Sequence, residues 1–242
     1  MRGSILFILI FASVNGFSQE NTESNLRKLK ADASVSINSN GIASIPAFSL
    51  GDPAVIASIA LAKNRFSYDP VLAYGLDMKP WFIDNWLHYK LIRRKDFEIR
   101  AGFNFSTFFS KTKLPDMTIL QGDRYFALEV AGIYRFTPNT SLTLMYWNDR
   151  GQEKGTIKGH FFNLLGEIYN IRLGNRLVMM TGAQLFAISY EGYNDGVFIS
   201  PKISFSMREV PFSLYWQATQ VIDSNIDPNP GFKWNIGLSY TL

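Results

Sequence analysis

The last eleven residues of the chain, 232–242, alternate strictly between two kinds of side chain. Successive side chains of a β-strand point to opposite faces, so this pattern predicts a strand with one apolar and one polar face. In a soluble sandwich the apolar face would pack on a second sheet, whereas in a membrane barrel it would contact lipid. The apolar or aromatic positions are Phe232, Trp234, Ile236, Leu238, Tyr240 and Leu242.

Similar alternation recurs along most of the chain. Between Phe97 and Phe105, for example, every second residue is apolar, and Glu98 and Arg100 lie between them. Small residues dominate the earliest segments, and Leu164–Leu165 interrupts one period, so we expect about twelve strands within a range of ten to twelve. The predicted strands are 42–50, 54–62, 65–76, 81–92, 97–108, 124–136, 140–149, 157–171, 176–190, 196–207, 211–222 and 232–242.

The composition agrees with alternating strands. Aromatic residues make up 15% of the 242 residues and charged residues only 18%, below the roughly 25% of an average globular protein. Mean hydropathy is nonetheless −0.01, and after the first twenty residues no run of about 18 apolar residues could form a membrane-spanning helix. A large apolar content without long apolar runs therefore favours an all-β chain.

The first residues resemble an export signal. Arg2 is followed by the apolar run Ile5–Val14, and Gly16 and Ser18 are small residues at the positions that signal peptidase requires. A membrane anchor helix is the alternative, but the run is too short to span about 30 Å of hydrocarbon. We expect residues 1–18 to be a cleaved signal peptide, 19–41 a flexible periplasmic segment and 42–242 the barrel.

Long and short connections between the predicted strands mostly alternate. Barrels of bacterial outer membranes have short turns on the periplasmic side and longer loops outside. Two predicted outer links, 51–53 and 77–80, are short and depart from the rule. The longest predicted outer loop, 107–124, could fold inward as a constriction. An even number of strands would place both termini on the periplasmic side.

The C-terminal residues also carry a recognisable motif. Asn235, Gly237, Tyr240 and Leu242 form polar-x-Gly-x-x-aromatic-x-hydrophobic, which resembles the C-terminal signal of bacterial outer-membrane barrels. The mature chain thus resembles the small outer-membrane β-barrels of Gram-negative bacteria, in particular those of the Bacteroidetes lineage. That resemblance implies a closed antiparallel up-and-down transmembrane barrel in the outer membrane, in contact with outer-membrane lipid. It also implies the barrel-assembly machinery as a partner during biogenesis.

Charged residues on the polar faces of the strands are the candidate lumen lining. Charges of both signs could line an aqueous channel and set its selectivity, or they could pair and plug a closed lumen. Twelve strands lie between small barrels filled by side chains and large porins that leave a channel. The candidates are Asp69, Asp84, His88, Lys90, Glu98, Arg100, Glu129, Arg135, Glu167, Lys202 and Lys233.

Catalytic and metal motifs are weak. The chain has two histidines and no cysteine, which excludes thiol catalysis, disulfides and a lipid-anchored cysteine. His160, with Asn163 and Asp149 nearby, could belong to a rim hydrolase, but solvated rim residues explain these side chains better. The loop Asp223–Gly231 could hold calcium, yet it lacks the full spacing of a calcium-binding loop. No zinc spacing, phosphate-binding loop or nucleophile elbow is present, and we expect no cofactor.

Nucleic acid is not an expected partner. The net charge is +4 and the pI is near 9.2, but the basic residues are dispersed singly in the sequence. The favoured hypothesis is therefore a narrow, porin-like channel for small polar solutes. The alternatives are an outer-membrane enzyme of lipase, deacylase or protease type, and a plugged barrel with a structural or docking role.

Overall fold

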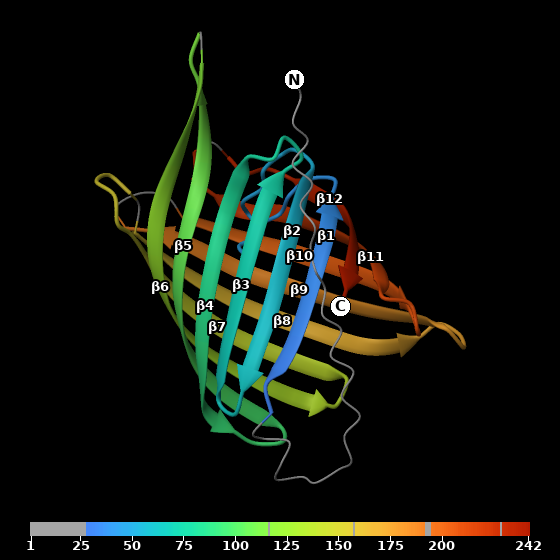
Figure 1. Ribbon diagram of the computed structural model, residues 1–242. Helices are drawn as coiled ribbons and strands as arrows, with labels where there is room; N and C mark the ends of the chain where they lie inside the picture. Colours follow the sequence, from blue (N-terminus) through green and yellow to red (C-terminus); the bar gives the residue numbers. More distant parts are fainter. Residues whose placement is uncertain (1–27, 116, 157, 192–194, 228) are drawn as a thin grey trace.

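The computed structural model describes residues 28–115, 117–156, 158–191, 195–227 and 229–242. These residues form a closed antiparallel barrel of twelve strands (Figure 1), which confirms the predicted fold class. Among the residues described, no helix is long and apolar enough to cross a membrane. The predicted signal peptide, residues 1–18, and residues 19–27 lie outside the described residues.

Each strand pairs with its neighbours in the sequence, and β1 pairs with β12 to close the barrel. The strands are β1 (Lys30–Asn38), β2 (Ala54–Lys63), β3 (Phe66–Gly75), β4 (Pro80–Arg93), β5 (Phe97–Lys113), β6 (Thr118–Thr137), β7 (Thr140–Gly151), β8 (Lys158–Arg172), β9 (Leu177–Tyr190), β10 (Asp195–Met207), β11 (Phe212–Ser224) and β12 (Lys233–Thr241). Closure joins Ser34–Asn38 to 237–241 in antiparallel register.

The apolar face of the strands points away from the barrel. In β12, Ile236 and Leu238 are 46% and 48% exposed, whereas Asn235 between them is only 1% exposed. The same inversion recurs in β6, where Leu128 and Val130 are exposed and Glu129 is buried. Apolar residues outside and polar residues inside are the arrangement of a membrane barrel, not of a soluble sandwich.

The first strand differs from the prediction. Residues 42–50 are not a strand of the barrel wall, and their only strand-like feature is an isolated bridge between Ile42 and Ser49. The wall begins instead at β1, whose sequence K-A-D-A-S-V-S-I-N alternates polar and apolar residues. Pro46 lacks the N–H that a central strand needs, which explains why the predicted segment does not join the sheet.

The connection between β1 and β2, residues 39–53, folds into the lumen, and we call it the inner loop. Its Ala43 packs in an apolar cluster with residues of β2, β3 and β4. Its Ala47 packs in a second cluster with residues of β8, β9 and β10. Between them, the Ser44 hydroxyl donates a hydrogen bond to Asp84 of β4 (3.0 Å). The inner loop therefore bridges opposite walls of the barrel.

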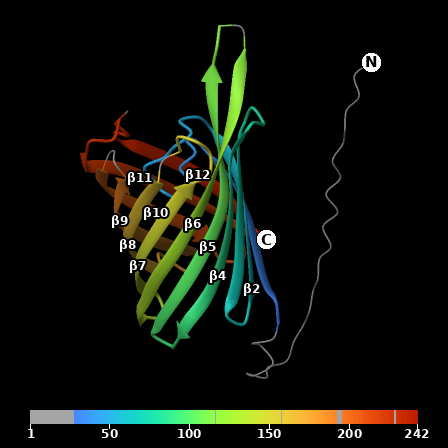
Figure 2. The same ribbon diagram turned by 90° about the vertical axis from the view of Figure 1, so that its left-hand side faces the viewer.

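The predicted outer loop 107–124 does not fold inward. Instead β5 and β6 continue to pair as far as Lys113 and Thr118, and their hairpin projects beyond the rest of the barrel (Figure 2). Lys111 Nζ lies 2.8 Å from Asp77 of the β3–β4 turn, an ion pair that ties the hairpin to the rim. The expected constriction at this loop is therefore wrong, and the inner loop occupies the lumen.

Candidate functional site

The barrel interior collects the predicted lumen residues. The strand register places all eleven on the face opposite the exposed apolar residues. That set contains five carboxylates, five cations and one histidine, so its charges balance. The carboxylates are Asp69, Asp84, Glu98, Glu129 and Glu167, and the cations are Lys90, Arg100, Arg135, Lys202 and Lys233.

Glu129 is the centre of a buried polar network. Its side chain is 1% exposed, and Arg100 Nε donates to it at 2.8 Å. Trp147 Nε1 donates to its other oxygen at 2.7 Å. His88 lies between two carboxylates, with Nδ1 2.8 Å from Asp69 and Nε2 3.4 Å from Glu129. Several donors thus satisfy a carboxylate that would be costly to bury alone.

A second group of charges lies nearer the short-turn end of the barrel. Glu98 accepts a hydrogen bond from Lys90 Nζ (2.9 Å), and Arg135 lies 3.7 Å from the same oxygen. Further round the wall, Lys202 Nζ lies 4.6 Å from the centre of the Tyr215 ring. These contacts run along the wall rather than across the lumen. The ion pairs therefore line the interior and do not bridge its opposite walls.

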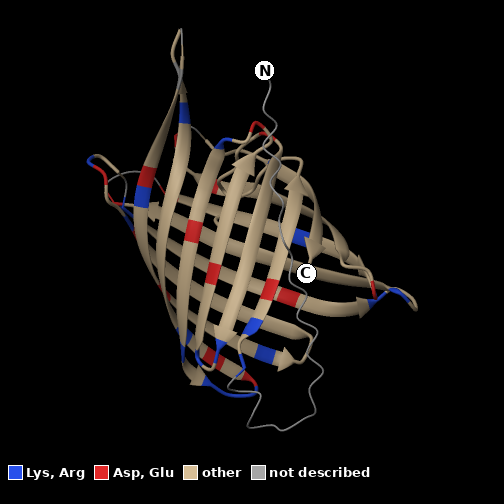
Figure 3. Cartoon of the chain, in the orientation of Figure 1, with Lys and Arg blue, Asp and Glu red and all other residues tan. Residues whose placement is uncertain are grey.

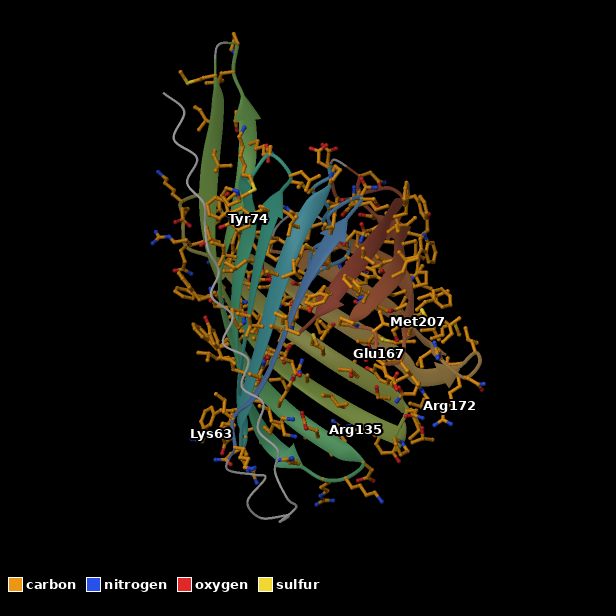
Figure 4. The ribbon with its side chains drawn as sticks, turned by 45° about the vertical axis from the view of Figure 1, so that its right-hand side comes forward. Lys63, Tyr74, Arg135, Glu167, Arg172 and Met207 are labelled. Carbon is orange, nitrogen blue, oxygen red and sulfur yellow. The ribbon has the colours of Figure 1, made fainter. Side chains whose placement is uncertain are left out.

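The described residues line two cavities at the short-turn end. The larger, which we call the vestibule, has a volume of about 720 Å³. The smaller has a volume of about 300 Å³ and reaches up to Glu167 and Tyr169. Arg135 lines both cavities, and Figure 4 shows Arg135 and Glu167 on the barrel wall, with Tyr74 toward the other end. The vestibule is lined by Asn64, Arg65, Lys90, Arg93, Arg94, Lys95, Glu98 and Arg135.

The vestibule brings together basic residues that are far apart in the sequence. The basic residues are dispersed along the chain, and Figure 3 shows them at both ends of the barrel, but the short turns bring Arg65 and Arg93–Lys95 together round one cavity. Arg65 and Arg93–Lys95 were not among the predicted site residues. The sequence contains one signal for this site: Arg93, Arg94 and Lys95 are consecutive in a predicted turn. A short turn places its side chains at the mouth of a barrel, so these three cations indicate a basic mouth.

The residues of the C-terminal motif lie at the closing seam. Asn235 Nδ2 donates to Asn38 Oδ1 at 2.9 Å, and Asn235 Oδ1 accepts from the Asn40 backbone N–H at 3.0 Å. Gly237 faces the Tyr215 ring, so closely that an added Cβ would lie 2.3 Å from Cζ. Tyr240 and Leu242 are exposed on the outer side. The two inward residues therefore hold β12 against β1 and β11.

The proposed rim hydrolase residues do not converge. Asn163 and Asp149 lie on the inward face, in register with Met145 and Gly159. His160 lies on the outer face, with Nδ1 2.8 Å from the Tyr146 hydroxyl and Nε2 3.7 Å from Glu191. Ser189 lies opposite His160 in the ladder, but among the described residues the two side chains share no hydrogen bond.

The loop Asp223–Gly231, the weaker calcium candidate of the sequence, contacts a neighbouring loop. Asn225 Oδ1 accepts a hydrogen bond from the Asp195 backbone N–H (2.6 Å), which links two outer loops. Within the described ranges, no three His, Cys, Asp or Glu residues are grouped to hold a metal ion. The bond between Asp195 and Asn225 joins the start of β10 to the residues that follow β11.

Two carboxyls outside the barrel wall are stabilised in their charged form. A hydrogen bond from Lys111 holds the pKa of Asp77 below its ordinary value. The pKa of Glu153 is lowered by the backbone N–H of Arg124 (2.8 Å) and then by the Arg124 guanidinium. Asp77 joins the β3–β4 turn to the hairpin, and Glu153 joins the β7–β8 loop to β6. Both contacts lie at the outer rim.

Comparisons with solved structures agree with the fold. The KdgM porin superposes with a TM-score of 0.55 at 14% identity, covering 86% of this chain and 98% of its own. The same porin in complex with disordered oligogalacturonate gives 0.53 at 14% identity, covering 87% and 97%. An outer membrane channel from Pseudomonas putida F1 gives 0.51 at 9% identity, covering 87% and 94%. No family model and no curated protein matches the sequence.

Proposed function

We propose that this chain is an integral outer-membrane barrel that acts as a narrow channel for small polar solutes. The observation that carries the proposal is a closed barrel whose outer face is apolar and whose charged interior contains two cavities, both lined in part by Arg135. Apolar residues in contact with lipid and polar residues round a lumen are the general plan of outer-membrane channels. The shared fold of the KdgM porin and of the Pseudomonas channel supports the same conclusion.

The inner loop defines where such a channel is narrowest. Both cavities lie at the short-turn end, whereas Ala43 and Ala47 of the inner loop pack between opposite walls. A solute that enters from the short-turn end meets charged side chains first and the inner loop afterwards. We therefore assign the constriction to residues 39–53, in place of the β5–β6 hairpin.

The same fold supports proposals on orientation and biogenesis. Short turns lie at the end where β1 begins and β12 ends, which fits a periplasmic location for that end. The motif Asn235–Leu242 supports recognition by the barrel-assembly machinery. The export-signal pattern and the aromatic content support an origin in the Bacteroidetes lineage.

Single-channel recording in planar lipid bilayers tests the proposal. We expect discrete conductance steps from the folded protein and a several-fold larger step after deletion of Ser44–Phe48, because that deletion removes the bridge across the lumen. The matched control deletes Lys111–Gln121 from the projecting hairpin, and its conductance should equal that of the full chain.

Folding must be verified separately for every variant. Heat-modifiable migration on a gel, with unboiled protein running ahead of boiled protein, reports the intact barrel. A folded barrel that stays silent both with and without Ser44–Phe48 would refute the channel. The docking alternative predicts a partner that is lost with Lys111–Gln121 while conductance is absent throughout.

A further inference from the structure

We infer that the vestibule is a binding site for small multivalent anions that carry carboxylate or phosphate groups. This inference rests on the proposed function, since it names the class of solute that the channel admits. The vestibule lining contains six cations, Arg65, Lys90, Arg93, Arg94, Lys95 and Arg135, and one carboxylate, Glu98. Six positive charges less one negative charge leave five positive charges round one cavity.

Internal pairing neutralises little of this charge. Glu98 is the partner of both Lys90 (2.9 Å) and Arg135 (3.7 Å), so a single carboxylate is shared between two cations. Arg65 uses its guanidinium to donate to the backbone carbonyls of Lys90 (3.1 Å) and Leu91 (2.9 Å), and among the described residues it forms no ion pair with a carboxylate. The lining therefore keeps a net positive charge that can attract an anionic ligand.

The cations are held in place by the turn that carries them. The Arg94 N–H donates to the Phe97 carbonyl at 2.8 Å, and the Arg135 N–H donates to the Asp96 carbonyl at 2.7 Å. Because the backbone is fixed on both sides, Arg93, Arg94 and Lys95 project from a defined position at the rim of the cavity. Guanidinium groups match carboxylate and phosphate oxygens through paired hydrogen bonds.

The size and position of the vestibule fit a soluble ligand. Its volume of about 720 Å³ lies within the roughly 300–1,000 Å³ of typical small-molecule sites. Lys90, Glu98 and Arg135 lie on the inward face of the strands, so the ligand would sit in the lumen mouth. A cavity of one sign with low-dielectric walls also concentrates its counter-ions before they bind.

Calorimetric titration of citrate into folded protein in a non-ionic detergent tests the site. We expect one binding event, at least tenfold weaker in the triple variant Arg93→Ala, Arg94→Ala, Lys95→Ala. Glu98→Gln should bind citrate several-fold tighter, because it releases Lys90 and Arg135 without changing the size of the side chain. General damage to the barrel would weaken citrate binding, so it could not explain tighter binding by the Glu98→Gln variant.

The matched control removes three cations from other short turns at the same end, Arg172→Ala, Arg176→Ala and Arg208→Ala. None of these residues lines the vestibule, so citrate should bind this variant as it binds the parent protein. Equal weakening in both triple variants, or unchanged binding in Glu98→Gln, would overturn the inference. Vesicles of phosphatidylglycerol, added in competition, separate a lipid phosphate from a free anion, and a site that prefers the vesicles would also refute it.

Bilayer recording separates this inference from the proposed function. If the barrel conducts, the reversal potential in a salt gradient should shift from anion selectivity toward neutrality in the Arg93–Lys95 triple variant. Citrate binding without any current would leave the site in place and refute the channel. Current without citrate binding or anion selectivity would leave the channel in place and refute the site.

Discussion

Gly237 shows how a single position serves both the sequence motif and the fold. Its neighbour across the ladder is Tyr215, whose hydroxyl hydrogen-bonds Asn38 Oδ1. Asn38 also accepts from Asn235 (2.9 Å), so one amide oxygen of β1 is bound by both β11 and β12. The tyrosine ring can lie flat over position 237 only because that residue has no side chain. Packing at the seam therefore accounts for the glycine of the motif.

Replacing Gly237 with alanine should weaken the seam. The new Cβ would lie 2.3 Å from Tyr215 Cζ, so the ring must move and its bond to Asn38 is lost. Overpacking of this kind typically costs about 1–3 kcal/mol. We expect a lower midpoint in urea-induced unfolding, followed by tryptophan fluorescence.

The double variant Gly237→Ala, Tyr215→Ala provides the control, since the smaller residue removes the clash. It should lose no more stability than Tyr215→Ala alone. A Gly237→Ala protein with an unchanged midpoint would show that the ring does not constrain this position.

Sequence periodicity identifies the inward residues but not their grouping. A period of two is enough to assign Glu98, Arg100 and Glu129 to one face, because register within a strand follows from the strand itself. Which of them pair depends on the alignment between strands, and that is set by turns whose length is ambiguous in the sequence. Arg65 and Arg135 come from turns and strands 70 residues apart in number, so the vestibule could not be read from a linear pattern.

At the scale of the elements, the prediction places the first strand at residues 42–50 and Lys30–Asn38 in a flexible segment. In the structure Lys30–Asn38 is the strand β1, and residues 42–50 belong to the inner loop. The alternation of Lys30–Asn38 is complete, but its outward residues begin with Ala31 and Ala33, which are weak hydrophobic signals. Residues 42–50 contain more apolar side chains, yet these lack a period of two and include Pro46. The structure buries this apolar segment in the lumen instead of placing it in the wall.

A charge within the inner loop should release it from the lumen. Ala47 is 2% exposed and packs with Phe161, Phe186 and Phe198. The variant Ala47→Glu would place an unpaired carboxylate among these rings, at a cost of several kcal/mol. We expect the loop to leave its site, with a larger single-channel conductance as the result.

The variant Leu114→Glu supplies the control, because Leu114 is 46% exposed and lies in the projecting β5–β6 hairpin, outside the inner loop. Its conductance should match that of the parent channel. Equal currents from the parent, Ala47→Glu and Leu114→Glu proteins would mean that the inner loop does not limit flow.

At the scale of the whole molecule, the two ends of the barrel differ in charge and shape. Basic side chains gather round the vestibule at the short-turn end. The other end carries the projecting β5–β6 hairpin and is crossed by the inner loop. Under the proposed function, this asymmetry would give the channel a direction, because an anion would be concentrated at one mouth and would meet the constriction toward the other. Which mouth faces the periplasm is therefore a functional question.

Trypsin digestion of intact Gram-negative cells that express the chain determines that orientation. If the hairpin faces outward, trypsin should cut after Lys111 or Lys113, while Arg93–Lys95 stay protected until the outer membrane is opened. Mass spectrometry of the fragments identifies the sites, and the variant Lys111→Gln, Lys113→Gln should lose the hairpin fragments alone. Cleavage at Arg93–Lys95 in intact cells would reverse the orientation, and the vestibule would then collect anions from the medium instead of from the periplasm.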